Sequence, residues 1–269
     1  YIKLLESYQK NCSLYNSYSG IGIHSIRAVK DYMIKEINLY NNHKLPFHLH
    51  ISEQKKEIAD CLSNYNYRPV EWLYNNIEIK GNHHLVHATH LNSNEINLIT
   101  KNQSNVVLCP ITEGNLADGF FNFNDFQKKM GKWCIGSDSH IGLSPFEEIR
   151  LLDYGVRLQT NSRKTFKNNS IGNAGLIVMN STFFNGMKAM GIKRKGFFEK
   201  GCYLNFLEIN KDHPNINIWD KNNLLNSILY GSDIRVIKNT YTKGSKRNND
   251  NKGYLKKYSK SIKRIIASV

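Results

Sequence analysis

The amino-acid sequence predicts an α/β fold with a parallel β-sheet. Between residues 20 and 140, short apolar runs alternate with longer segments in which apolar residues recur every three or four positions. A succession of five such strand–helix units excludes an all-β fold and an all-α bundle. The candidate strands are Gly20–His24, Phe47–Ile51, Leu85–Ala88, Val106–Cys109 and Trp133–Gly136.

Helices are predicted between these strands. Ser93 is the expected N-cap of one of them, because its hydroxyl can accept a hydrogen bond from an amide of the first turn. Pro110 ends the fourth strand, since proline has no amide proton for the sheet. The predicted helices cover Ala28–Tyr40, a segment that begins near Glu53, Pro69–Asn75 and Ser93–Lys101.

The pattern changes after Asp138. A long helix is predicted over Pro145–Thr160, a polar linker over Asn161–Asn173 and a second helix over Ala174–Met190. The residue that follows, Gly191, is typical of a helix end.

The last part of the chain contains shorter alternating segments. Cys202–Ile209 and Ile234–Lys238 predict a small β unit, and a basic helix is expected from about Tyr254 to Ile266. We therefore expect three parts: residues 1–195, residues 196–239, and a basic linker with the C-terminal helix over residues 240–269.

The net charge of +15 comes from 37 Lys and Arg against 22 Asp and Glu, and it is concentrated at the C-terminal end. Residues 238–269 hold ten basic residues and one acid, Asp250, and contribute +9. The stretch YLKKYSKSIKRI loosely interleaves aromatic and basic residues, which is a weak pattern for nucleic-acid binding. A solvated basic helix explains the same stretch, so we do not expect a nucleic-acid partner.

The cysteines and apolar segments indicate the cellular setting. The five cysteines form no CxxC pair, so the sequence predicts neither a disulfide framework nor a cysteine zinc site. No apolar run reaches the length of a membrane span, and the first residues lack the pattern of a signal peptide. We expect a cytoplasmic protein without a membrane partner.

Polar residues that suit a metal site lie at or just after strand ends, at His24, His50, His87 and Asp138. Active sites of α/β barrels form at the carboxyl ends of the strands, so these side chains are expected to lie together. Zinc binds imidazole nitrogen and carboxylate oxygen, and lowers the pKa of a bound water to about 7. Glu53 follows His50 by three residues and is suited to general acid–base catalysis beside the metal.

Each of these residues also has a purely structural interpretation. A histidine at a strand end is most often a hydrogen-bonded structural residue, and Asp138 could be the N-cap of the next helix. By spacing alone, His48 and His50 are the obvious ligand pair, because alternate strand residues share a face. The recurrence of suitable residues at the same position of successive units favours a site.

Six ordered motifs carry a resemblance to a known family. They resemble the deaminase branch of the amidohydrolase superfamily, and more closely the formimidoylglutamate deiminases of histidine degradation. The resemblance covers residues 15–190 clearly and continues more faintly through GFFEKGCYLNFLEI. The motifs are GIHSIRAV, HLHISEQ, RPVEWL, VHATHL, CPITEGNLADG and GSDSHIGLSPFEEIRLLDYGVRLQ.

The resemblance implies a fold and a metal. It implies that residues 1–195 form strands four to eight of a TIM (β/α)8 barrel of the metal-dependent hydrolase type, and that residues 196–239 belong to a small β-sandwich. One zinc ion, or another divalent metal, is expected on His50 and Asp138, which leaves His48 as a strand neighbour. The remaining ligands are expected upstream of Tyr1, in a strand that carries an HxH pair.

The resemblance also implies residue roles and a reaction. Glu53 matches the proton shuttle, His87 the histidine that orients the water, and Asp138 a metal ligand that takes a proton. His24 and Arg27 match the pair that holds the substrate carboxylates, and an Arg fork suits that task. The implied reaction is hydrolysis of N-formimidoyl-L-glutamate to N-formyl-L-glutamate and ammonia.

Two further expectations concern activity and assembly, and two alternative functions remain open. Residues 1–269 alone are expected to be inactive, because two zinc ligands would be missing, and the full-length protein is expected to be a homodimer. Another deaminase or chlorohydrolase acting on a nucleobase-like ring is an alternative, since it would share the HxxE, strand-six His and SDS residues. It would have no need for the HSIR pair at His24 and Arg27. A basic nucleic-acid-binding fragment is the alternative from another class.

Overall fold

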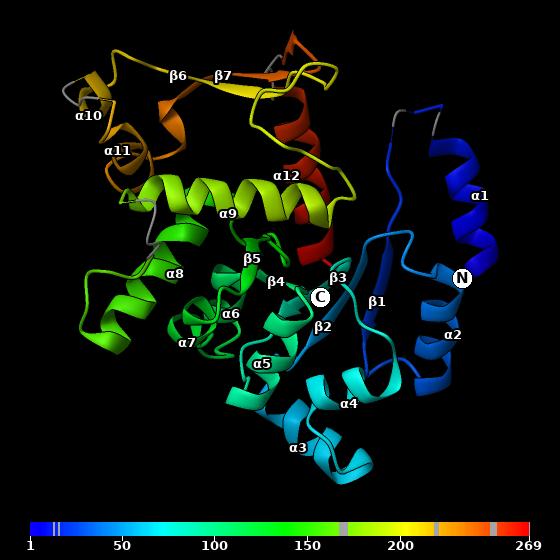
Figure 1. Ribbon diagram of the computed structural model, residues 1–269. Coiled ribbons are helices and arrows are strands. Elements are labelled where there is room, and N and C mark those ends of the chain that lie inside the picture. The colour runs from blue at the N-terminus through cyan, green and yellow to red at the C-terminus, as the bar shows by residue number, and fades with distance from the viewer. Residues whose placement is uncertain (13, 16, 167–171, 218–220, 248–251, 269) are drawn as a thin grey trace.

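The computed structural model describes residues 1–269 except 13, 16, 167–171, 218–220, 248–251 and 269 (Figure 1). Its main element is a parallel sheet of five strands in sequential order. The predicted α/β fold with a parallel sheet is therefore confirmed, and each strand lies within two residues of its expected position. The strands are β1 (Ile21–Ser25), β2 (Phe47–Ile51), β3 (His83–His87), β4 (Asn105–Leu108) and β5 (Lys132–Ile135).

The sheet has one apolar and one polar face. On one face, alternate strand residues such as Ile23, Leu49 and Leu85 are buried in the hydrophobic core. On the other face, one register row joins all five strands and carries mainly polar side chains. This row consists of Gly22, His48, His84, Asn105 and Lys132.

Helices connect the strands and supply the rest of this core. Two of them, α6 and α7, have only six residues each, which is too short for a helical period to show in the sequence. The helix over Ser93–Lys101 is present, but its N-cap is Asn92 and not Ser93: Asn92 and Glu95 each accept the other's backbone amide. The helices of this part are α1 (Ile2–Cys12), α2 (Asp31–Asn41), α3 (Lys55–Tyr65), α4 (Pro69–Asn76), α5 (Ser93–Lys101), α6 (Pro110–Asn115) and α7 (Phe123–Lys128).

Two long helices follow β5, as predicted: α8 (Pro145–Thr160) and α9 (Ala174–Ala189). Residues 167–171 of the predicted polar linker lie outside the described residues. Helix α9 packs against β5, and its last residue accepts a hydrogen bond from His48 Nε2 at 2.8 Å. Gly191, just beyond, has φ +74, and a Cβ there would lie 3.0 Å from Pro46 Cγ. The helix end therefore requires glycine.

The last part of the chain forms a second, antiparallel sheet of β6 (Phe206–Ile209), β7 (Ile237–Thr242) and β8 (Ser245–Lys246). Two predictions are corrected here. Ile234–Val236 is a 3-10 helix rather than the start of a strand. The strand also continues past residue 239, because β7 turns back through Lys243 and pairs with β8, so the first residues of the predicted linker belong to the sheet.

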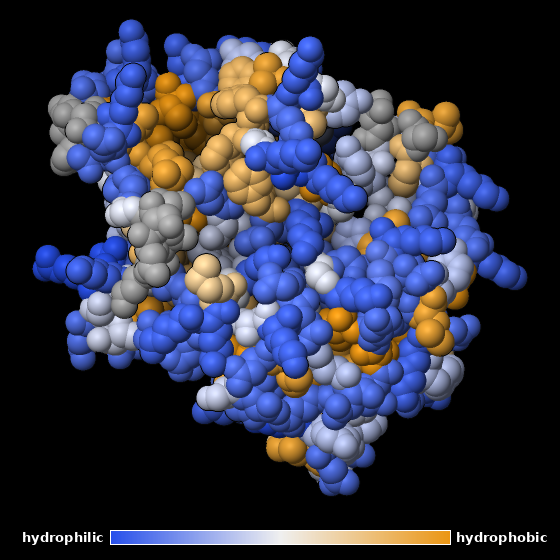
Figure 2. All heavy atoms as spheres, viewed as in Figure 1, coloured by the Kyte–Doolittle hydropathy of each residue, from blue (hydrophilic) through white to orange (hydrophobic). Residues whose placement is uncertain are grey.

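The remaining helices are α10 (Pro214–Asn217), α11 (Leu224–Tyr230) and the basic helix α12 (Lys252–Ile266). Figure 2 shows apolar side chains gathered on the upper part of the molecule, around α11 and β6, where Leu207 is 48% exposed. Every helix within the described part of the chain is too short or too polar to span a membrane. All five cysteines are free thiols, as expected.

Candidate active site

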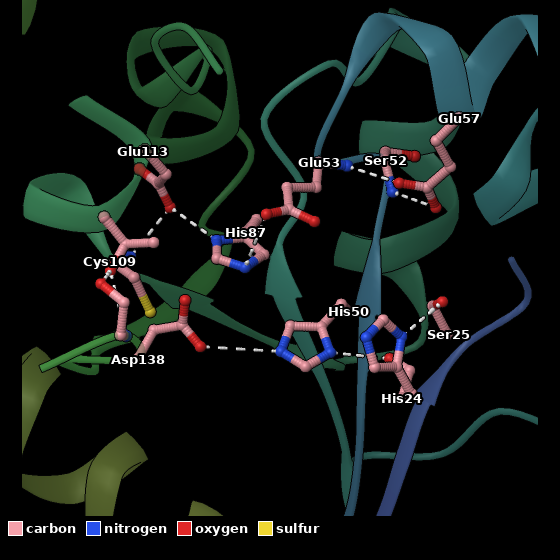
Figure 3. A network of polar contacts seen from close by, with 12 residues as sticks. His24, Ser25, His50, Ser52, Glu53, Glu57, His87, Cys109, Glu113 and Asp138 are labelled. Atoms are coloured by element: carbon pink, nitrogen blue, oxygen red, sulfur yellow. Dashed lines mark hydrogen bonds and ion pairs between the residues drawn. The ribbon is translucent and has the colours of Figure 1, made fainter. Parts of the chain in front are cut away.

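Three side chains converge at the carboxyl ends of the parallel strands: His50 from β2, His87 from β3 and Asp138 from the turn after β5 (Figure 3). One ligand atom of each lies within 4.8 Å of the others. The first and third are the metal ligands expected from the sequence. The structure adds a nitrogen of His87, which the strand-end pattern had included among the residues that suit a metal site and which the resemblance matched to the histidine that orients the water.

Local backbone geometry brings His87 into this cluster. Val86 is in register with His50, so a regular strand would direct the next side chain to the opposite face of the sheet. His87 instead has φ +67, and its ring stacks beside that of His50 with the centroids 5.4 Å apart. A left-handed conformation is costly for a residue other than glycine, and such residues cluster at functional sites.

Asp138 also lies in a left-handed turn, with φ +41. Thr112 of α6 holds this turn, because its hydroxyl oxygen accepts the backbone amide of Ser139 at 3.3 Å. Asp138 is not the N-cap of the following helix: Ser144 takes that place and accepts the amide of Glu147. The carboxylate of Asp138 is therefore available to the cluster.

The hydrogen bonds of His50 determine which of its nitrogens can bind a metal. Its Nδ1 lies 2.7 Å from the carbonyl oxygen of His24, which can only accept, so Nδ1 carries the proton. The unprotonated Nε2 then faces Asp138 Oδ1 at 3.7 Å. The Nε2 of His50 and the Oδ1 of Asp138 are thus two acceptors that face one another, while Nδ1 donates to a backbone carbonyl. This arrangement is typical of a metal-binding histidine.

His87 has a comparable arrangement, but it is fully buried. Its Nδ1 lies 3.3 Å from Glu113 Oε1, and its Nε2 has no hydrogen-bond partner among the described residues. A buried polar nitrogen without a partner is costly unless something binds it. Burial by itself lowers the pKa of His87, but the hydrogen bond and charge of Glu113, with the charges of Glu53 and Asp138, raise it above its usual value. The residues present therefore fit a divalent cation at this point.

Glu53 lies beside the cluster, with Oε1 3.6 Å from His87 Nε2. Its other oxygen, Oε2, accepts a hydrogen bond of 2.5 Å from Arg27 Nη2. Burial would raise the pKa of Glu53, but the hydrogen bond from Arg27 and the nearby charges of His87, Arg27 and His50 lower it below its usual value. The carboxylate is therefore kept ionised close to the metal-binding atoms.

The two residues expected to hold the substrate are both near this site. The His24 ring lies beside that of His50, with the centroids 5.1 Å apart, and its Nδ1 is 2.8 Å from Ser25 Oγ. Arg27 contacts Glu53, and its Nε lies 3.8 Å from Glu57 Oε2. His48, the other histidine of the HxH pair, lies outside the cluster, where its ring stacks on His84.

Two buried carboxylates at this site were not found from the sequence. Glu57, in the first turn of α3, accepts the backbone amides of Ser52 and Glu53, both at 2.9 Å. Glu113, at the start of α6, accepts the amide of Cys109 at 2.8 Å. A glutamate that reaches back to amides before its helix is a capping pattern, which was the available signal in both segments.

Comparison with known proteins identifies relatives of this chain. The model of the amidohydrolase family matches residues 10–246. Formimidoylglutamate deiminase of Pseudomonas aeruginosa is 32% identical over 244 residues, which are 91% of this chain and 54% of that protein. The predicted resemblance is therefore confirmed.

Two crystal structures share the fold. An amidohydrolase from Brucella melitensis, 27% identical, superposes with a TM-score of 0.90 over 98% of this chain and 59% of its own. An adenosine deaminase from Xanthomonas campestris, determined with bound zinc, is 20% identical with a TM-score of 0.82 over 93% of this chain and 57% of its own. The chain spans between half and three fifths of the length of these three proteins. It belongs to the amidohydrolase family.

Proposed function

We propose that this chain forms the later part of the catalytic domain of a metal-dependent hydrolase that converts N-formimidoyl-L-glutamate to N-formyl-L-glutamate and ammonia. The observation that carries the proposal is the convergence of His50, His87, Asp138 and Glu53 in a chain similar to formimidoylglutamate deiminase. In this proposal the five parallel strands are strands four to eight of a barrel, and the sheet of β6 to β8 belongs to a small β-sandwich.

His50 and Asp138 would hold the metal, and the free Nε2 of His87 is close enough to the same point to contribute. A divalent cation such as zinc supplies Lewis acidity there and lowers the pKa of a water molecule to about 7. Catalytic zinc sites usually have three or more protein ligands. We place the remaining ligands on a segment outside these 269 residues, and in the complete protein we propose a homodimer.

Glu53 would move the protons. Its ionised carboxylate can accept a proton from the attacking water and deliver it to the imino nitrogen of the substrate. Attack on the formimidoyl carbon gives a tetrahedral carbon. Asp138 would accept the second proton of the water, and His87 would orient the water through Nε2. Asp138 would then pass its proton to the same nitrogen, and collapse of the tetrahedral carbon would break the carbon–nitrogen bond, release ammonia and leave the formyl group.

His24 and Arg27 would bind the carboxylates of the glutamate part. The guanidinium of arginine carries five N–H donors, and the contacts to Glu53 and Glu57 involve Nη2 and Nε. Arg27 can therefore hold Glu53 and a substrate carboxylate together. A deaminase acting on a nucleobase-like ring is the second candidate, favoured by the fold shared with an adenosine deaminase.

Ammonia release decides between these candidates. The zinc-loaded chain, supplemented by the N-terminal part of the Pseudomonas aeruginosa relative, is offered N-formimidoyl-L-glutamate or adenosine, with Glu53→Gln as the inactive control. We expect ammonia and N-formyl-L-glutamate from the first substrate only. Turnover of adenosine alone would support the second candidate. The same assay on the chain alone, which we expect to be inactive, tests whether ligands from another segment are needed.

A further inference from the structure

Glu113 occupies a place at the site that the proposed reaction does not use. The residue is only 4% exposed, and its Oε1 accepts the backbone amide of Cys109 at 2.8 Å. The same oxygen lies 3.3 Å from Nδ1 of His87. Figure 3 shows the two side chains facing one another. One carboxylate oxygen therefore connects the start of α6 to the most buried histidine of the cluster.

We propose that Glu113 is a positioning residue that holds His87 in the Nδ1–H tautomer, so that its Nε2 lone pair points to the place shared with His50 and Asp138. A carboxylate oxygen that already accepts an amide proton is an acceptor toward the imidazole, so Nδ1 must be the donor. The proton-free Nε2 then either binds the metal or accepts a hydrogen bond from water.

The two histidines of the cluster share the same pattern of hydrogen bonding. His50 donates Nδ1–H to the carbonyl oxygen of His24, and His87 donates Nδ1–H to Glu113. In both cases the acceptor belongs to a neighbouring strand–helix unit, and in both cases Nε2 faces the cluster. Partners of this kind fix the ring orientation and the basicity of a metal-binding histidine. The use of this tautomer rests on the proposed metal-dependent function, but the tautomer itself does not.

Glu148 offers a matched control. It is a buried carboxylate on α8 whose Oε2 accepts the amide of Ile111 at 2.9 Å, so it anchors the same helix α6 without a hydrogen bond to His87. Glu148→Gln removes a buried carboxyl group near the site but leaves the acceptor of His87 in place. An effect specific to Glu113 is therefore separable from a general effect of losing a buried carboxylate.

The tautomer is measured directly by long-range proton–nitrogen correlation spectra of protein labelled with 15N-histidine, recorded at a pH above the raised pKa of His87, where its ring is neutral, with His87→Gln to assign the signals. We expect Nδ1–H in the wild type, in Glu148→Gln and in Glu113→Gln, whose amide oxygen can accept both bonds. In Glu113→Leu, we expect His87 to shift toward Nε2–H. An Nε2–H tautomer in the wild type overturns the proposal even if Glu113→Leu does not fold, and so does an unchanged tautomer in a folded Glu113→Leu.

Cobalt binding, followed by its visible absorption, gives a second readout. We expect Glu113→Leu to bind Co2+ about 10- to 100-fold more weakly than the wild type, while Glu113→Gln and Glu148→Gln stay close to it. Equal affinity in Glu113→Leu and the wild type contradicts the positioning role. A wild-type chain that binds no Co2+ even when supplemented by the N-terminal part of the Pseudomonas aeruginosa relative, but shows the Nδ1–H tautomer, refutes the proposed metal-dependent function and leaves the tautomer assignment intact.

Discussion

Arg27 Nη2 lies 2.5 Å from Glu53 Oε2 and joins the segment after β1 to the segment after β2. The cation is the main reason why the pKa of Glu53 is lowered in spite of its burial. A base near the metal-binding atoms is thereby kept ready to accept a proton, and the same guanidinium is the expected contact of the substrate.

The first prediction concerns the pH dependence of turnover in Arg27→Met. Activity that needs ionised Glu53 is lost as the pH falls through the pKa of that group. Since Arg27 lowers this pKa, its removal raises it, and the acidic limb of the kcat profile moves to higher pH. Arg68→Met, which breaks the ion pair with Glu95 away from the cluster, serves as the control and is expected to leave that limb in place. An unchanged limb in Arg27→Met argues against the pairing as the cause.

The second prediction separates catalysis from metal binding at Glu53. Glu53→Gln is expected to keep the metal content of the wild type, because no ligand is removed. Its kcat should fall about 100- to 10,000-fold, since the general base is lost. Metal analysis and steady-state kinetics on the same preparation check both parts. Retained turnover would exclude the role assigned to Glu53.

The third prediction compares two histidines that lie two residues apart on one strand. His50→Gln should weaken Zn2+ binding by more than the about 10- to 100-fold typical of an outer partner, because it removes a ligand. His48→Gln should bind Zn2+ as the wild type does, since His48 donates to Ala189 and stacks on His84. Competition with a chromophoric chelator measures both constants. Similar losses in the two variants would show that the HxH pair acts as a unit.

The fourth prediction concerns stability and pH at Glu148. Burial raises the pKa of this carboxyl from 4.5 to about 7. A raised folded-state pKa means that its neutral form is favoured by the fold, so stability is lost as the pH rises from about 4.5 to about 7. Glu148→Gln should therefore gain stability relative to the wild type at pH 8, by up to about 3 kcal/mol, and little at pH 5. Denaturant unfolding at both pH values checks this, and an equal difference at the two would contradict it.

Several features of the fold followed from local patterns alone. Short segments such as Phe47–Ile51 predicted the strands, because apolar residues at alternate positions place one face of a strand in the core. The long helices after β5 followed from their period, and the helix end at Gly191 from its residue type. Position at strand ends, where parallel strands bring side chains together, singled out His24, His50, His87 and Asp138, and the family resemblance then assigned the metal to His50 and Asp138.

Other features of the fold could not be predicted from local sequence patterns. The strand β7 runs past residue 239 because β8 pairs with it, and a pairing partner is not visible in the strand's own sequence. The helices α6 and α7 are too short for the helical spacing of apolar residues to be recognised in the sequence. The orientation of His87 depends on its left-handed backbone conformation. The sequence gives no sign of this conformation, because only glycine adopts it readily.

By itself, the sequence determined which residues form the strands and which polar side chains stand at the strand ends, because both depend on neighbours along the chain. Only the tertiary structure decided the pairs that define the site, His24 with His50, Arg27 with Glu53 and His87 with Glu113. Each pair joins residues 26 positions apart in adjacent strand–helix units. Such contacts depend on how neighbouring strands are aligned and how their turns bend, which is settled only when the sheet is packed.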